Sequence, residues 1–213
     1  YQEGLRIPPV RLYEAGKPVQ AIFDVIERNV RVPRYALGDL RAQLAACHIA
    51  QREVEALCER DGLETVRAGF AALLEYGERL TRVEIEKMED GVYAFEDQLD
   101  GDGIDPGGIP IRLALTVEGD RLIADFDGTA PQVRGAINCA ISFTKSAVYA
   151  CVRCLISEDV PTNSGFFRCI EVRAPEASLV NPVLPAPVAA RGLTGFRLAN
   201  VIMGALAGLA PDR

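Results

Sequence analysis

The sequence predicts an α+β fold, in which an antiparallel helical hairpin is followed by a mixed α/β region that contains a β-hairpin. Up to about residue 90, apolar side chains recur at helical spacing. From Val92 the spacing changes to the alternation that is typical of strands. The order is helices first, then a hairpin, then mixed elements, which favours α+β over a doubly wound sheet. The expected domains are residues 1–90, helical with an extended N-terminal arm, and residues 91–213, mixed α+β.

Three helices are expected in the first domain. The first covers about residues 18–30, because Pro18 suits a first helical turn and apolar residues follow at helical spacing. Asp39 is the expected N-cap of the second helix, and Gly62 its C-cap. The third helix begins near Leu63, directly after that glycine. Two long helices joined by so short a turn predict an antiparallel hairpin.

The β-hairpin is the most direct local prediction. "VYAFEDQL" from Val92 has the pattern of a strand, and apolar residues alternate with others from Ile111 to Val117. Gly119 and Asp120 then form a tight turn into "RLIADFD".

Mixed elements are expected after the hairpin. Residues 142–157 have a helical pattern, "FFRCIEVRAP" that of a strand, "NPVLPAPVAA" that of an extended connector, and residues 194–209 that of an Ala/Leu/Gly helix.

Charge and composition exclude several classes of function. The net charge is −7, and residues 38–100 carry seven Lys/Arg against fifteen Asp/Glu. Nucleic-acid surfaces need clustered cations, so no nucleic-acid partner is expected. No run of eighteen apolar residues is present, so no membrane partner is expected and the location is predicted as cytoplasmic. The six cysteines are expected to be free thiols, because a chain this long and apolar does not need disulfides.

Motifs for metal, nucleophilic or redox chemistry are weak. His48, the only histidine, has no partners at ligand spacing. Cys151 and Cys154 lie inside a predicted helix, where two buried thiols are a better interpretation than a redox pair. The acidic loop "EDQLDGDGIDPGG" lacks the EF-hand pattern and is interpreted as exposed, so no metal site is assigned. Neither a G-x-G-x-x-G motif nor a P-loop is present.

Six ordered blocks resemble the hydantoinase B/oxoprolinase family, which includes N-methylhydantoinase B and the C-terminal half of 5-oxoprolinase. They are "QEGLRIPPVRLYEAG", "GDLRAQLAA", "FDGTAPQVRGAINC", "TKSAVYACVRCLI", "NSGFFRCIEVRAPEASLVNP" and "GALAGLAPDR". Because members of that family are usually more than twice this length, the chain is expected to be an internal segment of a larger subunit. One departure is Cys139-Ala140, where the family often has Cys-Pro.

The resemblance implies an ATP-dependent hydrolase of cyclic amides that works as a hetero-oligomer. A hydantoinase A-like subunit or domain would hold ATP and Mg²⁺ and phosphorylate the carbonyl oxygen of a small lactam such as 5-oxoproline or a hydantoin. The B-type subunit would then support opening of the activated ring. A divalent metal would belong to the region that precedes this segment in the family, so the segment itself is expected to bind no cofactor and to be inactive alone.

The site residues that we single out lie in or beside family-like blocks. Asp39 and Arg41 are the candidate catalytic residues, as an anion-orienting pair at a helix start or, equally, as an N-cap and a surface charge. Candidate substrate-binding residues, which the sequence also allows to be structural, are Arg6, Asn138, Asn163, Arg168 and Arg191.

Two alternatives stay open. Acetone and acetophenone carboxylase alpha subunits resemble the same family and activate a ketone for carboxylation. In another class of function, the segment is a non-catalytic scaffold that docks the ATP-using subunit.

Overall fold

A computed structural model describes residues 4–157 and 159–209, and the α+β class is confirmed. The chain forms two compact units, one that ends at Phe70 and one that begins at Ala71. We refer to them as the N-terminal unit and the C-terminal unit. Their boundary falls inside one long helix, and the predicted domains 1–90 and 91–213 stay a prediction.

The N-terminal unit consists of a short strand pair and helices. Its elements are β1 (Tyr13–Glu14), β2 (Lys17–Pro18), α1 (Gln20–Asn29), α2 (Pro33–Asp61) and the first part of α3 (Leu63–Ile85). Phe23 and Ile26 of α1 pack with Leu37 of α2 into a small core. The helix predicted at residues 18–30 is confirmed as α1, but Pro18 lies in β2 and not in the first helical turn, so the helix begins at Gln20.

Helix α2 differs from the prediction at its start. It begins at Pro33, because proline suits a first helical turn, so Asp39 lies inside the helix and its predicted N-cap role is wrong. Gly62 ends the helix with φ of +85°, as a glycine at a helix end allows. Ile49 and Val54 of α2 and Leu63 of α3 are exposed, and the antiparallel hairpin expected for these two helices stays a prediction.

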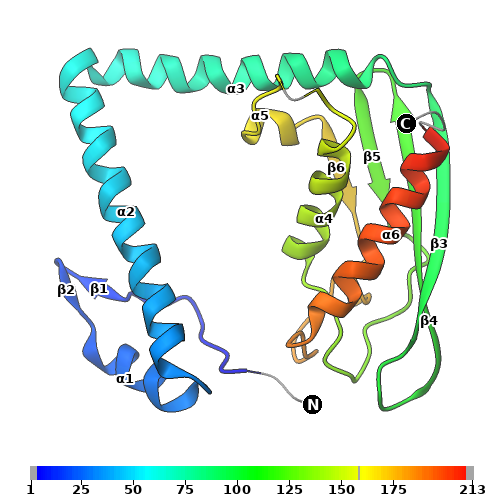
Figure 1. The fold of residues 1–213 in the computed structure, drawn as a ribbon, viewed down its shortest axis with the longest axis horizontal. Helices are drawn as coiled ribbons and strands as arrows, with labels where there is room; N and C mark the ends of the chain where they lie inside the picture. Colours follow the sequence, from blue (N-terminus) through cyan, green and yellow to red (C-terminus); the bar gives the residue numbers. More distant parts are fainter. Residues whose placement is uncertain (1–3, 158, 210–213) are drawn as a thin grey trace. The chain divides into compact units, whose positions relative to one another are not determined.

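The C-terminal unit is built on one sheet whose strand order is β3-β4-β5-β6 among the described residues. The strands are β3 (Gly91–Gly101), β4 (Pro106–Glu118), β5 (Arg121–Asp125) and β6 (Ile170–Arg173). The first three pair antiparallel, and β6 pairs parallel to β5. Helices α4 (Ile141–Arg153) and α6 (Arg191–Leu209) cover one face of this sheet, and the short helix α5 (Ser164–Phe167) precedes β6 (Figure 1).

The predicted hairpin is confirmed, and one predicted strand is partly wrong. Glu118 pairs with Arg121 across a turn in which Gly119 has φ of +58°. The strand predicted for "FFRCIEVRAP" starts too early, because Phe166 and Phe167 belong to α5 and only Ile170–Arg173 is a strand. The signal for α5 was in the sequence, since asparagine is a good N-cap and the Asn163 side chain accepts a bond from the Gly165 N–H.

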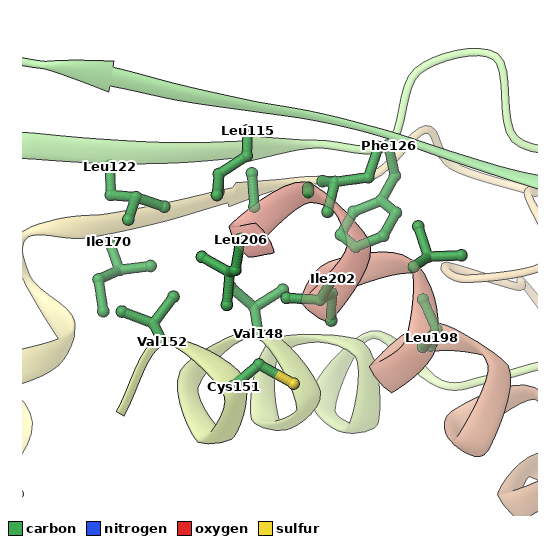
Figure 2. Close-up of a cluster of buried hydrophobic side chains, with 14 of the residues drawn as sticks. Leu115, Leu122, Phe126, Val148, Cys151, Val152, Ile170, Leu198, Ile202 and Leu206 are labelled. Carbon is green, nitrogen blue, oxygen red and sulfur yellow. The ribbon is translucent and has the colours of Figure 1, made fainter. Parts of the chain in front are cut away.

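The core of the C-terminal unit lies between the sheet and its two covering helices. Alternate residues of β4, including Leu115, point toward the helices because strand side chains alternate between faces. Figure 2 shows Val148 of α4 and Ile202 and Leu206 of α6 in one cluster below Leu115, with Leu198 farther along α6. This closed core fixes the positions from which the connecting loops emerge.

Candidate functional site

Three segments of the C-terminal unit are joined by hydrogen bonds, and we call them the loop cluster: residues 102–110, which include the start of β4, residues 129–139 and residues 177–190. The Ala130 N–H donates to Pro110 O at 3.0 Å, and the Leu179 N–H to Ala130 O at 2.9 Å. The Ala190 N–H donates to Ala136 O at 2.8 Å. Each segment is therefore held in place by another. A binding site needs such support, because its groups must keep a fixed geometry.

Asn138 is the hub of the loop cluster, by which we mean that its side chain joins several backbone groups of the cluster. Its side chain is fully buried, and Oδ1 accepts from the Val133 N–H at 2.8 Å. Its Nδ2 donates to Val133 O at 2.8 Å, to Gly135 O at 3.1 Å and to Pro187 O at 3.0 Å. The amide therefore satisfies backbone groups that would otherwise be buried without partners. Its predicted contact with substrate stays a prediction.

Asp102 fastens the acidic loop to the same cluster. One carboxylate oxygen accepts the N–H groups of Ile104 and Asp105, and the other accepts the Gly135 N–H at 2.8 Å. The Asp105 N–H is the main reason that the pKa of Asp102 lies below its ordinary value. A side chain at Gly135 would collide with the Asp102 backbone, so only glycine fits there.

Two adjacent hollows share the residues Gln132, Val133 and Arg134. One, of about 440 Å³, lies between these residues and the acidic loop, and the other, of about 280 Å³, lies between them and Pro185–Pro187. The Arg134 side chain is 63% exposed and reaches Asp105 Oδ1 at 3.3 Å. A guanidinium on a rigid loop between two hollows is suited to binding a carboxylate or phosphate.

Arg134 was not among the residues singled out from the sequence. A signal for it was present, because it is the one cationic residue in the block "FDGTAPQVRGAINC".

Arg191 lies at the same end of the C-terminal unit. It is the first residue of α6, is exposed, and donates to Val188 O at 3.3 Å. Its charge also acts on Cys139: burial raises the pKa of that thiol, whereas a hydrogen bond with Thr144 and the Arg191 cation oppose the rise. Of the predicted substrate-binding residues, the structure thus associates Asn138 and Arg191 with the loop cluster.

Asn163 and Arg168 belong to a different contact, between α5 and α3. Asn163 Nδ2 donates to Leu73 O at 3.0 Å, and Arg168 donates to Glu78 at 3.0 Å. Arg82 holds the same carboxylate at 2.8 Å, and these two cations, Arg82 first, lower the pKa of Glu78. The observed contacts of Asn163 and Arg168 join helices, and their substrate-binding role stays a prediction.

Asp39, Arg41 and Arg6 lie in the N-terminal unit. Asp39 and Arg41 are exposed residues inside α2. The argument that placed them at a helix start therefore no longer supports them, although their catalytic role stays a prediction. Arg6 is exposed in the extended segment before β1, as the sequence predicts for the N-terminal arm.

Metal ligands do not gather in the part of the chain that the structure describes. Within residues 4–157 and 159–209, no group of three or more His, Cys, Asp or Glu side chains could hold an ion. His48 is exposed on α2. The six cysteines are free thiols, which confirms that prediction.

Comparison with known proteins decides the family. The family profile named hydantoinase B/oxoprolinase matches residues 1–213. The chain belongs to the hydantoinase B/oxoprolinase family.

Relatives within this family are longer than the chain. A protein described as the B-type subunit of a D-/L-hydantoinase, from Pseudomonas sp. (strain NS671), is 37% identical over all of this chain and 38% of its own length. The crystal structure of the ATP-dependent caprolactamase from Pseudomonas jessenii matches with a TM-score of 0.89 and 31% identity, over all of this chain and 37% of that one. The chain thus spans less than two-fifths of these relatives.

A more distant structure shares the fold. Nucleotide-free acetone carboxylase superposes with a TM-score of 0.82 and 18% identity, over 98% of this chain and 29% of that one. At this identity the likeness shows the fold alone.

Proposed function

We propose that the chain is the part of a B-type subunit that binds and orients a cyclic amide in an ATP-dependent ring-opening hydrolase. The observation that carries the proposal is the likeness, over the whole chain, to a caprolactamase described as ATP-dependent. Relatives named as subunits support a hetero-oligomer, in which a hydantoinase A-like partner would hold ATP and Mg²⁺ in the cytoplasm.

The division of labour follows from the chemistry of amides. A lactam carbonyl is a poor electrophile, and phosphorylation of its oxygen makes the ring carbon open to attack by water. The C–N bond of the resulting tetrahedral intermediate then breaks as the ring nitrogen takes a proton, and a second water hydrolyses the acyl phosphate to the open-chain acid and phosphate. The activated ring carries negative charge on the new phosphoryl group. Arg134 and Arg191 would bind that charge, and the rigid backbone around Asn138 would hold Arg134 in place.

The test uses a chimera in which this chain replaces the matching region of the Pseudomonas hydantoinase B-type subunit. The chimera, its ATP-using partner, ATP and Mg²⁺ are given hydantoins, 5-oxoproline, caprolactam, or acetone with bicarbonate. We expect ring opening that is coupled to phosphate release. Turnover of acetone that depends on bicarbonate would overturn the proposal in favour of carboxylation, and assembly without turnover of any substrate would favour a scaffold.

Two substitutions locate the site. Arg134→Gln is expected to lower kcat/KM for ring opening at least about tenfold, because it removes a charge-assisted contact with the phosphoryl group. Arg121→Gln, an exposed arginine at the start of β5, is the matched control and is expected to leave kcat/KM unchanged. Arg41→Ala tests the predicted catalytic residue on α2, and unchanged turnover would assign Arg41 a structural role.

A further inference from the structure

Helix α6 is apolar on the face that it turns away from the core as well as on the face that it buries. Leu198, Ile202 and Leu206 are fully buried against the sheet and α4. On the opposite side, Leu193 is 60% exposed, Phe196 76% and Met203 46%. A helix that is apolar all round is normally buried on every side.

The exposed residues form one continuous strip. Residues 193, 196, 200, 203 and 207 recur at the three- and four-residue steps that place side chains on one helix face, and all five are exposed. None of them is charged and only Asn200 is polar, although surface helices usually carry charge on the outside. The nearest cation, Arg197, is engaged by Asp97 at 2.6 Å.

Two aromatic rings widen this strip. The Phe143 ring lies so close to Gly195, and the Phe95 ring so close to Gly204, that a side chain at either glycine would collide with it. Phe143 and Phe95 remain 37% and 41% exposed. We call Leu193, Phe196, Met203, Phe95 and Phe143 together the α6 outer face.

A protein partner fits this face better than a lipid bilayer. By length and composition α6 could span a membrane, but 39% of its apolar stretch is already buried within the protein. Its inner residues pack against β3, β4 and α4, which holds one side of the helix away from any bilayer. Only the outer strip needs a cover.

The length of the relatives indicates what covers this strip. More than three-fifths of the Pseudomonas hydantoinase B-type subunit and of the caprolactamase chain lies outside the region that this chain matches. Polypeptide of the same subunit can cover the strip without the loss of translational freedom that a separate partner incurs. We propose that the α6 outer face is an internal packing surface, covered in a full B-type subunit by the polypeptide outside these 213 residues.

The experiment compares one substitution in two settings: the 213-residue chain and the chimera with the Pseudomonas hydantoinase B-type subunit. In the chain alone, Phe196→Glu should leave the melting temperature nearly unchanged, because the side chain is exposed. In the chimera it should lower the melting temperature by more than about 5 °C, because it buries an unpaired charge. Val92→Glu, at a position 66% exposed on β3, is the control and should have little effect in both.

A second measurement uses only the unsubstituted proteins, so it does not require that a variant folds. The chain has two methionines, Met88 and Met203, so the oxidation of each by peroxide can be followed by mass spectrometry. Oxidation of Met203 should slow several-fold from the chain to the unsubstituted chimera, with partly buried Met88 as the internal reference.

Three results would overturn the proposal. If Phe196→Glu leaves the melting temperature unchanged in both settings and Met203 is oxidised at the same rate in both, the α6 outer face stays uncovered. A concentration-dependent dimer of the chain that Phe196→Glu dissociates means that a second copy covers it. Binding of the chimera to phosphatidylcholine vesicles that Phe196→Glu abolishes means that lipid covers it.

Discussion

The two units of this protein differ most in how they are stabilised. The N-terminal unit has one small cluster of buried side chains, Phe23, Ile26 and Leu37, at one end of α2. The C-terminal unit buries a continuous core that includes Phe126, Leu115 and the inner face of α6. Most of α2 beyond Leu44 is exposed, so its helical state depends on local propensity far more than α6 does. Long-range packing therefore supports the loop cluster, whereas most side chains of α2 lack such packing.

The largest expected effect sharpens this contrast. Phe126→Ala should destabilise the C-terminal unit by about 3–5 kcal/mol, because it empties a fully buried aromatic site. Denaturation followed by circular dichroism, with hydrogen exchange to separate the units, measures the change. Amides of α1 should keep their protection, and their loss would contradict the contrast.

The next effect tests whether the loop cluster is as rigid as its hydrogen bonds indicate. Asn138→Ala should cost about 2–3 kcal/mol, because it leaves a buried N–H group and buried carbonyls without their partner. Asn181→Ala, which removes a hydrogen bond to Ala174 O, is the matched control and should cost about 1 kcal/mol. Equal losses in the two variants, measured by urea unfolding, would contradict the role of Asn138 as the hub.

A smaller effect concerns pH and the contact between α3 and α5. Because Arg82 and Arg168 lower the pKa of Glu78, its stabilising effect is present above the ordinary value of 4.5 and is lost as pH falls through the lower folded value. Between pH 6 and pH 3, the melting temperature should therefore fall more steeply for the natural chain than for Glu78→Gln. If the melting temperature falls equally steeply with pH in both proteins, the Glu78 carboxylate does not contribute to the stability of the fold.

The smallest effect is expected on α2. Ile49→Ser should change the free energy of unfolding by less than about 0.5 kcal/mol, because Ile49 is 54% exposed and the two residues have similar helix propensities. Thermal unfolding followed by circular dichroism measures it. A loss above about 1 kcal/mol would mean that the exposed side of α2 is covered in solution.

Local signals in the sequence accounted for much of the fold. The alternation along β4 and the Gly119 turn predicted the hairpin correctly, because both act between neighbouring residues. The start of α2 was misplaced because Asp39 was interpreted as an N-cap, although Pro33 was the stronger start signal. The Phe166–Phe167 pair was interpreted as strand because bulky apolar residues favour strands wherever no cap is recognised.

The candidate site was less accessible to sequence reasoning. The bond from Asn138 to Pro187 O joins residues far apart in sequence, and no periodicity encodes such a contact. The position of Arg134 between two hollows likewise depends on how three loops meet. The sequence identified the family-like blocks that carry these residues, and the structure shows which atoms they bring together.

The strand order β3-β4-β5-β6 repeats the order of the strands along the chain. During synthesis on the ribosome, the first three strands can pair as soon as each emerges, because only short turns separate them. The fourth strand must wait for the 44 residues between Asp125 and Ile170, which include α4. Its parallel pairing is a late, non-local step, and until then the edge of β5 is open to wrong partners. The nascent chain is therefore expected to need protection most while α4 and α5 are being made.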